Sequence, residues 1–140
     1  MDSEQTYKLE VEALLDNLPQ VQVFIEQSAE ALGAPFSVVI PMQIALEELF
    51  VNICHYAYAN ESKPGPARFI CGVKDQSFWI QLEDDGVAFD PLAQTDPDIA
   101  ASAEERPIGG LGIFMVKQSM DEFTYERDGG TNRQYLAKQF

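Results

Sequence analysis

Two pairs of closely spaced strands constrain the fold of this chain more than any other feature. Within each pair, apolar and polar side chains alternate, and the connection is only a few residues long. Such a connection suits an antiparallel hairpin, because parallel neighbours need a crossover of about a dozen residues or more. The predicted strands are Arg68–Lys74 and Phe78–Glu83, joined at Asp75-Gln76, and Glu122–Arg127 and Arg133–Lys138, joined at Asp128-Gly129-Gly130. The sheet should therefore be mostly antiparallel.

Three segments have the residue spacing of helices and supply a second layer. Apolar residues recur at helical intervals over Leu18–Leu32 and from about Pro41 to Tyr58, and a short helix is predicted over Leu111–Met120. A further strand, Thr6–Val11, precedes them. This order lacks the alternation of βαβ units. We predict one α+β domain over residues 1–140, a two-layer sandwich with helices on one face of the sheet.

Charge restricts the classes of partner. The chain has 140 residues and a formal net charge of −14. Nucleic acids are disfavoured because phosphate backbones are held mainly by Lys and Arg, and anionic membrane surfaces are disfavoured for the same reason. A solubility surface is the ordinary explanation of this acidity, and steering of a partner is the alternative. In so acidic a chain, a site for a polyanionic ligand would need Mg²⁺ and backbone N–H groups rather than many basic side chains.

The sequence favours a cytoplasmic protein. No apolar run approaches the roughly 20 residues of a bilayer-spanning helix, and the acidic start MDSEQTYKLE does not resemble a secretion signal. Cys54 and Cys71 form no CxxC motif and His55 is the only histidine, so no structural zinc site is expected. Two reduced thiols are typical of the cytoplasm.

Glu48 and Asn52 form the first candidate constellation, in the segment ALEELFVN. Their i to i+4 spacing places both side chains on one helix face, off the apolar stripe. The asparagine oxygen is a hard ligand that suits Mg²⁺, and the glutamate can accept a proton from an attacking hydroxyl or water. Taken alone, such a pair is more often a solvated helix face.

Asp84 and Gly86 form the second, where the strand Phe78–Glu83 ends. The apolar residues of that strand alternate along one face, and Asp84 continues the same face toward the expected core. A buried carboxylate without a partner costs several kcal/mol, and the amino group of adenine would satisfy it. Gly86 would let a flat ring approach the backbone, and Thr131 at the last hairpin is a candidate to support Asp84. Ordinary turns are the alternative for both segments.

Glycines at Gly109, Gly110 and Gly112 precede the predicted third helix. They would let backbone N–H groups and the helix dipole face a phosphate. The glycines follow a loop rather than a strand, and GxGxxG and GxxxxGK[ST] are both absent, so Rossmann and phosphate-loop sites are excluded. A flexible hinge is the alternative, and it is compatible with phosphate binding.

The segment Asp90–Pro107 lacks clear periodicity and contains three prolines. A loop of this length inside a compact domain is usually a functional lid or disordered. Its only cation is Arg106. We predict a lid over about residues 90–108.

In this order and spacing, the segments resemble the ATPase superfamily shared by gyrase, heat-shock chaperones and sensor histidine kinases. Glu48…Asn52 resembles its N box, Asp84-x-Gly86 its first glycine box, and Gly110-x-Gly112 its second. Within the superfamily, the chain is most similar to the anti-sigma-factor serine/threonine kinases. The similarity covers about residues 41–138 and is carried by ALEELFVNICHYAY, DDGVAFDPL, RPIGGLGIFMVKQSMDEFTYER and GTN.

The resemblance implies a fold and a set of residue roles. The fold is a sheet with helices on one face, with ATP between the helices and a mobile lid. By position, Asn52 would coordinate Mg²⁺, Glu48 would be the general base, Asp84 would accept from the adenine amino group with Gly86 beside the ring, and Thr131 would support the adenine end. Gly110, Leu111 and Gly112 would shape the lid hinge against the phosphates, with Arg106 as the cation of the lid.

The resemblance also implies partners. The substrate would be a serine or threonine on a STAS-type anti-anti-sigma domain, and the unphosphorylated domain would release a sigma factor that the kinase otherwise holds. Such kinases are commonly homodimers paired through the sheet.

Two departures from the family pattern keep other functions open. Many relatives have His-Ala or His-Gly four residues after the asparagine, whereas this chain has Tyr56-Ala57, and the predicted lid carries no lysine. The second hypothesis is therefore a nucleotide-binding module that sequesters its partner without phosphoryl transfer. A detached histidine-kinase catalytic domain ranks below both, because no second domain with a phosphorylatable histidine is present.

Overall fold

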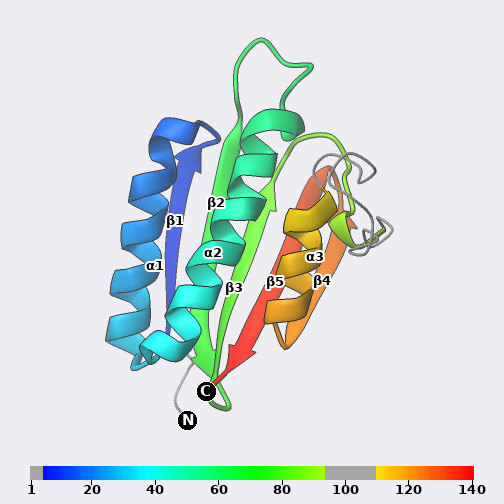
Figure 1. The fold of residues 1–140 in the computed structure, drawn as a ribbon. Helices are drawn as coiled ribbons and strands as arrows, with labels where there is room; N and C mark the ends of the chain where they lie inside the picture. Colours follow the sequence, from blue (N-terminus) through cyan, green and yellow to red (C-terminus); the bar gives the residue numbers. More distant parts are fainter. Residues whose placement is uncertain (1–4, 94–109) are drawn as a thin grey trace.

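The computed structural model describes residues 5–93 and 110–140. Within them, five strands form one sheet in the order β1-β2-β3-β5-β4, and every neighbouring pair is antiparallel (Figure 1). The strands are β1 (Thr6–Glu12), β2 (Pro66–Lys74), β3 (Ser77–Asp84), β4 (Glu122–Asp128) and β5 (Thr131–Gln139). Both predicted hairpins are confirmed, and the pairing of β3 with β5 joins them into one sheet.

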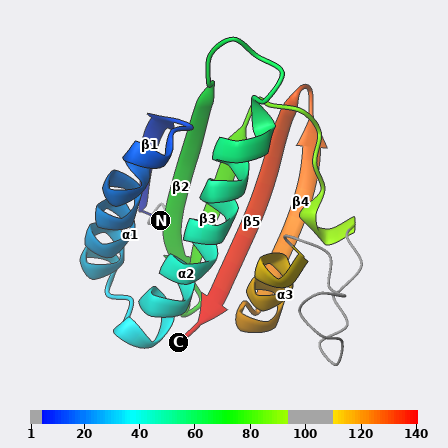
Figure 2. The ribbon, with the colours of Figure 1, turned by 45° about the horizontal axis from the view of Figure 1, so that its top comes forward.

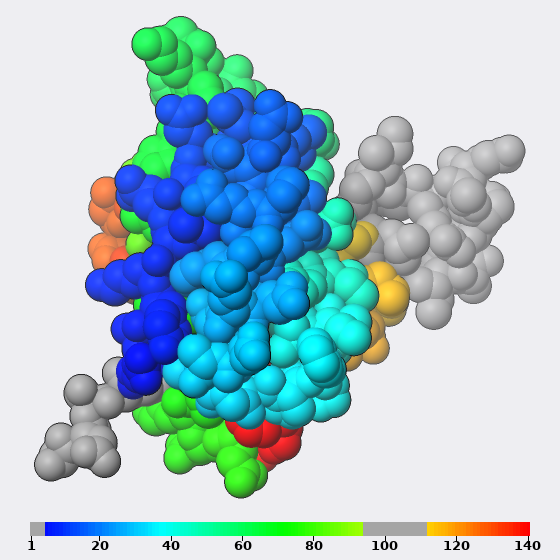
Figure 3. Space-filling model, turned by 90° about the vertical axis from the view of Figure 1, so that its left-hand side faces the viewer, coloured from blue at the N-terminus to red at the C-terminus, as the bar shows by residue number. Residues whose placement is uncertain are grey.

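The helices cover one face of this sheet. The longer elements are α1 (Leu18–Leu32), α2 (Phe36–Asn52) and α3 (Gly110–Ser119); η1 (Leu15–Asn17) and η3 (Pro91–Ala93) are short 3-10 turns, and η2 (Ile53–Ala57) is a π-helical turn. Figure 2 shows the three helices side by side over the sheet, and Figure 3 shows the two layers from the β1 edge. The predicted α+β sandwich is confirmed.

The predicted start of the second helix was wrong, whereas its predicted end near Tyr58 lies within one residue of Ala57, where η2 ends. The helix begins at Phe36 rather than near Pro41, so Pro41 lies inside it. A proline disfavours helix in the preceding residues, but Val38 and Val39 are buried in the core, and their packing outweighs that preference. At the other end the regular helix stops at Asn52 and continues as the π turn η2.

The core lies between the sheet and α2. Alternate side chains of β2 and β3 point toward the helices and are fully buried, whereas their neighbours face the open side. Phe69 of β2 lies at the centre of this packing, with its ring centroid 5.9 Å from that of Phe50 on α2 and 6.5 Å from that of Phe24 on α1. Burial of such aromatic rings contributes much of the stability of a core.

The central helix is unusually apolar. By length and composition alone, Phe36–Ala57 qualifies as a membrane span, with a mean hydropathy of 1.5. Of its most apolar window, 44% is buried inside the fold, and the segment carries Glu47 and Glu48. Its role as the core helix accounts for the buried part of this apolar character.

The open face of the sheet carries a row of alternating charges across all five strands. Adjacent positions in this row are Glu10, Arg68, Glu83, Arg133 and Glu126. Within the row, Arg133 Nε lies 2.7 Å from Glu83 Oε2, and Arg133 also pairs with Glu126. Burial raises the pKa of Glu83, but hydrogen bonds from Arg133 and Arg68 outweigh it and lower that pKa below its usual value. Next to the row, the rings of Trp79 and Tyr135 are stacked.

Phe69 and Ile70 provide a direct test of which face holds the core. We expect Phe69→Ala to cost about 3–5 kcal/mol, because it empties a fully buried site. Ile70→Ala, on the half-buried open face, should cost only about 1 kcal/mol. Urea unfolding monitored by circular dichroism measures both, and equal losses would contradict the two-layer packing.

Candidate functional site

The buried acid at the end of β3 is the starting point of the site. Asp84 follows the inward face of the strand, as the alternation predicted, and is only 3% exposed. Its Oδ1 accepts hydrogen bonds from the backbone N of Gly86 and from Nδ2 of Asn132, each 2.9 Å long. Both of these donors meet the same oxygen, so within the part of the chain that the structure describes Oδ2 is the carboxylate oxygen available to a further donor.

Asn132 is the residue that fixes this acid and the following loop. It lies opposite Asp84 in the β3–β5 register. Its Nδ2 also donates to the carbonyl of Val87 at 2.7 Å, and its Oδ1 accepts from the hydroxyl of Tyr125 and from the backbone N of Phe89. One buried carboxamide therefore ties the end of β3, the loop after it and β4 together.

The support expected from Thr131 is instead supplied by Asn132. The hydroxyl of Thr131 donates to Oδ1 of Asp85 at 2.9 Å, on the side of the sheet opposite Asp84. The reason is the period of two along a strand: Thr131 and Asn132 are consecutive, so only one of them can face the helices. The β5 register determines which one does.

Burial determines the protonation behaviour of Asp84. Desolvation raises the pKa of its carboxyl, hydrogen bonds from Asn132 and Gly86 oppose that rise, and the net shift is upward. The neighbouring Asp85 behaves differently, because the guanidinium of Arg68 binds both of its oxygens, at 2.7 and 2.9 Å, and lowers the pKa of that carboxyl. The two consecutive aspartates therefore differ. Asp84 is buried and its pKa is raised, whereas Asp85 is paired with Arg68 and its pKa is lowered.

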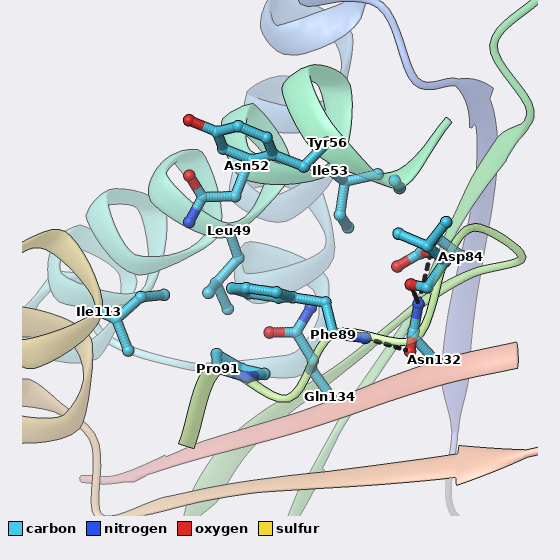
Figure 4. A pocket seen from close by; sticks show the side chains of 12 residues that line it. Leu49, Asn52, Ile53, Tyr56, Asp84, Phe89, Pro91, Ile113, Asn132 and Gln134 are labelled. Carbon is cyan, nitrogen blue, oxygen red and sulfur yellow. Dashed lines mark hydrogen bonds between the residues drawn. The ribbon is translucent and has the colours of Figure 1, made fainter. Parts of the chain in front are cut away.

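A small cavity of about 50 Å³ lies in front of Asp84. Figure 4 shows Asp84, Asn132 and Gln134 on the sheet side, the residues of α2 and η2 above them, and Phe89 and Pro91 from the loop. The complete lining is Leu49, Asn52, Ile53, Tyr56, Ala57, Asp84, Val87, Phe89, Pro91, Ile113, Asn132 and Gln134. Asp84 and Asn52, which the sequence placed in one site, therefore line one cavity.

Gln134 is a lining residue that the sequence reasoning missed. It is 6% exposed, and its Oε1 is a buried acceptor for which the part of the chain that the structure describes offers no hydrogen-bond partner. Buried polar atoms are nearly always satisfied, so this oxygen in the cavity wall is suited to a donor from a ligand. Its signal in the sequence was a polar residue on the inward face of a predicted strand, two positions before the buried Leu136.

Glu48 lies outside this cavity. It shares a side of α2 with Asn52, but its carboxylate rests at the seam between α2 and α3, against Gly112. A Cβ atom added at Gly112 would overlap that carboxylate. Asn52 therefore lines the cavity, whereas Glu48 lines a separate groove between α2 and α3.

Gly86 has a structural reason to be glycine that differs from the one expected. A Cβ there would overlap the backbone carbonyl of Ala57 in η2. The next residue, Val87, donates its backbone N–H to that carbonyl at 2.9 Å. The close approach that Gly86 permits is therefore between the loop and the π turn, and it closes one side of the cavity.

Several predicted site residues lie outside the described residues. These are Arg106, Gly109 and most of the predicted lid Asp90–Pro107, of which only residues 90–93 are described. Gly110 begins α3, as the helix prediction implied to within one residue. The side chain of Leu111 also lies outside the described part.

The cavity suits a ligand that brings its own metal. Among residues 5–93 and 110–140, no group of three or more His, Cys, Asp or Glu could hold a metal ion. The carboxylate and carboxamide oxygens in the cavity wall belong to Asn52, Asp84, Asn132 and Gln134. Mg²⁺ is usually held by one or two protein ligands plus substrate phosphates, and this donor set is compatible with that arrangement.

Comparison with known proteins places this geometry in a family. A model of the histidine kinase-like ATPase domain matches residues 11–137. The chain belongs to this family. Serine-protein kinases RsbW of Bacillus cereus (strain AH820) and Bacillus thuringiensis (strain Al Hakam) are each 24% identical over 134 residues, covering 93% of this chain and 82% of the relative.

A solved structure shares the fold. The RsbU and RsbW domains of Rv1364c from Mycobacterium tuberculosis align with a TM-score of 0.68 at 14% identity, over 96% of this chain. This chain spans 32% of that longer protein. The resemblance to histidine kinase-like ATPases predicted from the sequence is thereby confirmed.

In this histidine kinase-like ATPase domain, two glycine substitutions should have opposite effects on stability. Gly86→Ala places a Cβ against backbone and should cost about 1–3 kcal/mol. Gly112→Ala meets only the flexible end of Glu48 and improves helix propensity by up to about 1 kcal/mol, so we expect no loss of stability. Thermal unfolding measures both, and a loss at Gly112 matching that at Gly86 would contradict the geometry.

Asp84→Asn should leave the ligand-free domain at least as stable as the wild type at neutral pH. The folded-state pKa of Asp84 is raised, so the ionised group destabilises the fold, and this penalty develops as pH rises from about 4 through the folded-state pKa. The melting temperature of the variant relative to wild type should therefore increase over that range and then level off. If the melting temperature of the variant instead fell relative to that of the wild type as pH rises, the burial assigned to Asp84 would be contradicted.

Proposed function

We propose that the domain binds Mg²⁺-ATP in the cavity and transfers the terminal phosphoryl group to a protein hydroxyl. The observation that supports this most is that the buried carboxylate of Asp84 shares a mostly apolar cavity with the carboxamide of Asn52. A flat, partly apolar base with one amino group suits the end of the cavity at Asp84, and a metal-bound phosphate chain suits the end at Asn52.

Asp84 and Gln134 are assigned to the base. Oδ2 of Asp84 is left for the adenine amino group, because Oδ1 already accepts two hydrogen bonds. The unpartnered Oε1 of Gln134 offers a second acceptor in the same wall. Leu49 and Ile113 supply apolar surface for the ring. At about 50 Å³ the cavity must widen to admit a base, and Phe89 of the loop after β3 is one of the side chains that line it.

Asn52 and the start of α3 are assigned to the phosphates. Asn52 would provide the protein ligand of Mg²⁺, which neutralises phosphate charge and holds the chain in place. The N-terminal turn of α3, with Gly110, Leu111 and Gly112, supplies backbone N–H groups and a favourable dipole. Arg106 and the segment 90–107 complete the phosphate end in this proposal. An acidic chain can bind a polyanion only with such neutralisation.

Glu48 is assigned the role of general base, which accepts the proton of the acceptor hydroxyl. The hydroxyl oxygen of the acceptor forms a bond to the terminal phosphorus, the bond from that phosphorus to its bridging oxygen breaks, and ADP leaves. The hydroxyl proton passes to the carboxylate of Glu48. Its place at the α2–α3 seam, outside the base cavity, suits a group that meets the acceptor rather than the nucleotide. Relatives that share the fold carry the name serine-protein kinase.

The protein partners follow from the same family. We infer that a STAS-type anti-anti-sigma domain carries the acceptor hydroxyl, that a sigma factor is the second partner, and that the protein acts in the cytoplasm. The open face of the sheet, with Ile70, Trp79 and Tyr135, is the surface for a homodimer. Sequestration without transfer is the second candidate function, favoured by Tyr56, which is 60% exposed at the cavity where many relatives have histidine.

Three substitutions separate binding from transfer. Asn52→Ala should weaken Mg²⁺-dependent ATP binding by about 1–3 kcal/mol.

Asp84→Asn should weaken ATP binding about tenfold or more and shift preference toward inosine triphosphate, because Oδ1 keeps its two donors and the new NH₂ faces the base. Glu48→Gln should retain ATP binding and lose phosphorylation of the STAS proteins encoded near the gene. Calorimetry and labelled-ATP transfer measure these effects.

Controls make each outcome decisive. Glu30→Gln, an exposed acid on α1, should change neither binding nor transfer. Equal ATP affinity with and without Mg²⁺ would contradict the role of Asn52. Nucleotide binding without labelling of any STAS partner by the wild type would overturn the kinase assignment and favour sequestration. An Asp84→Asn variant that still prefers ATP to the inosine nucleotide would remove the assigned base contact.

A further inference from the structure

A second hollow lies between α2 and α3 and shares no lining residue with the base cavity. It is an open groove of about 570 Å³. Its lining is Ile40, Pro41, Ile44, Ala45, Glu47, Glu48, Val51, Gly112, Met115, Val116 and Ser119. Figure 1 shows the two helices that form its walls side by side over the sheet. Glu48, assigned above to the acceptor proton, is part of this groove.

The rim of the groove exposes large apolar side chains. Ile40, Ile44 and Met115 are 57%, 63% and 56% exposed. Phe36, 74% exposed, lies one turn before Ile40 on α2, so three apolar residues follow each other at intervals of four along one ridge. The solvent side of a surface helix is ordinarily polar. A contiguous apolar ridge beside a groove indicates a surface that another molecule covers.

The charges of the groove are all of one sign. Among residues 5–93 and 110–140, Glu47 and Glu48 are the charged residues that line it, and the whole chain carries a net charge of −14. Acidic side chains beside exposed apolar ones repel acidic partners and attract a partner that combines apolar residues with Lys or Arg. It also opposes anionic membrane surfaces. A second copy paired symmetrically through this groove would bring the same acidic side chains close to one another.

We propose that the α2–α3 groove is the docking site of a partner helix with an apolar face flanked by Lys or Arg, carried by the protein that presents the acceptor hydroxyl. From Ile40 to Val51 the wall runs about 16 Å at 1.5 Å per residue, enough for about three turns of an amphipathic helix with anchors at i, i+3 or i+4, and i+7. This inference rests on the proposed kinase function, because it directs the acceptor toward Glu48.

The test uses the full chain and synthetic peptides. A helical Leu/Lys peptide of about 14 residues, with leucines at i, i+3, i+4 and i+7, is the probe, and the same pattern with Glu in place of Lys is its control. Fluorescence anisotropy should show binding of the Lys peptide and none of the Glu peptide. In spectra of methyl-labelled protein, signals of Ile40, Ile44 and Met115 should shift, whereas those of Val23 on α1 should not.

Matched variants separate the groove from general acidity. Ile44→Ser combined with Met115→Ser should weaken peptide binding about tenfold. Val23→Ser combined with Leu15→Ser, two positions that are 49% and 48% exposed outside the groove, should change it less than about twofold. Glu47→Gln should weaken binding more than Glu26→Gln on α1. Equal effects of the groove and control variants would overturn the proposal.

Other occupants give distinct results, each of which would overturn the proposal. Self-association of the wild type that is lost in the Ile44→Ser, Met115→Ser variant would assign the groove to a second copy. Binding to phosphatidylglycerol vesicles, lost in the same variant, would assign it to a membrane. ATP binding is measured in parallel: its absence in the wild type refutes the proposed function alone, whereas ATP binding without peptide binding refutes the groove alone.

Discussion

The hydrogen bond between Asp84 and Asn132 is the interaction on which the site depends. It joins the ends of β3 and β5 across the register, and the same carboxamide holds the following loop through Val87 and Phe89. The cavity exists because this loop is drawn across the end of the sheet while Gly86 lets it approach η2. Satisfying one oxygen of the acid and leaving the other free makes the buried charge tolerable and available to a ligand.

Alternation along the strands explains how much of this could be predicted. A period of two fixes which residues share a face, so the inward direction of Asp84 could be predicted from its own strand. The same argument applied to β5 would have identified Gln134 and, extended one residue before the predicted start at Arg133, would have chosen Asn132 over Thr131. The start of α2 was missed because core packing of Val38 and Val39 overrides the local effect of Pro41.

The relation between Glu48 and Asn52 shows a further limit of local patterns. Spacing of i to i+4 correctly places both on one side of a helix, yet it carries no information about what packs there. The backbone of α3 comes so close to Glu48 that a Cβ at position 112 would displace its carboxylate, and one helix face is divided between two hollows. Pairing of distant segments, rather than the sequence of either helix, produces that division.

Such a division gives each hollow a separate physical task. The inner cavity has buried polar groups suited to the proposed small, flat ligand, whereas the outer groove has the exposed apolar side chains and acidic residues of the proposed docking surface. No lining residue is common to both. A substitution that removes only the carboxylate of Glu48 would therefore leave the lining of the cavity and the apolar side chains of the groove unchanged. A domain built this way would retain the proposed partner after losing the proposed phosphoryl transfer, so the two proposed functions, sequestration and kinase activity, are compatible with one fold and would differ at a few side chains.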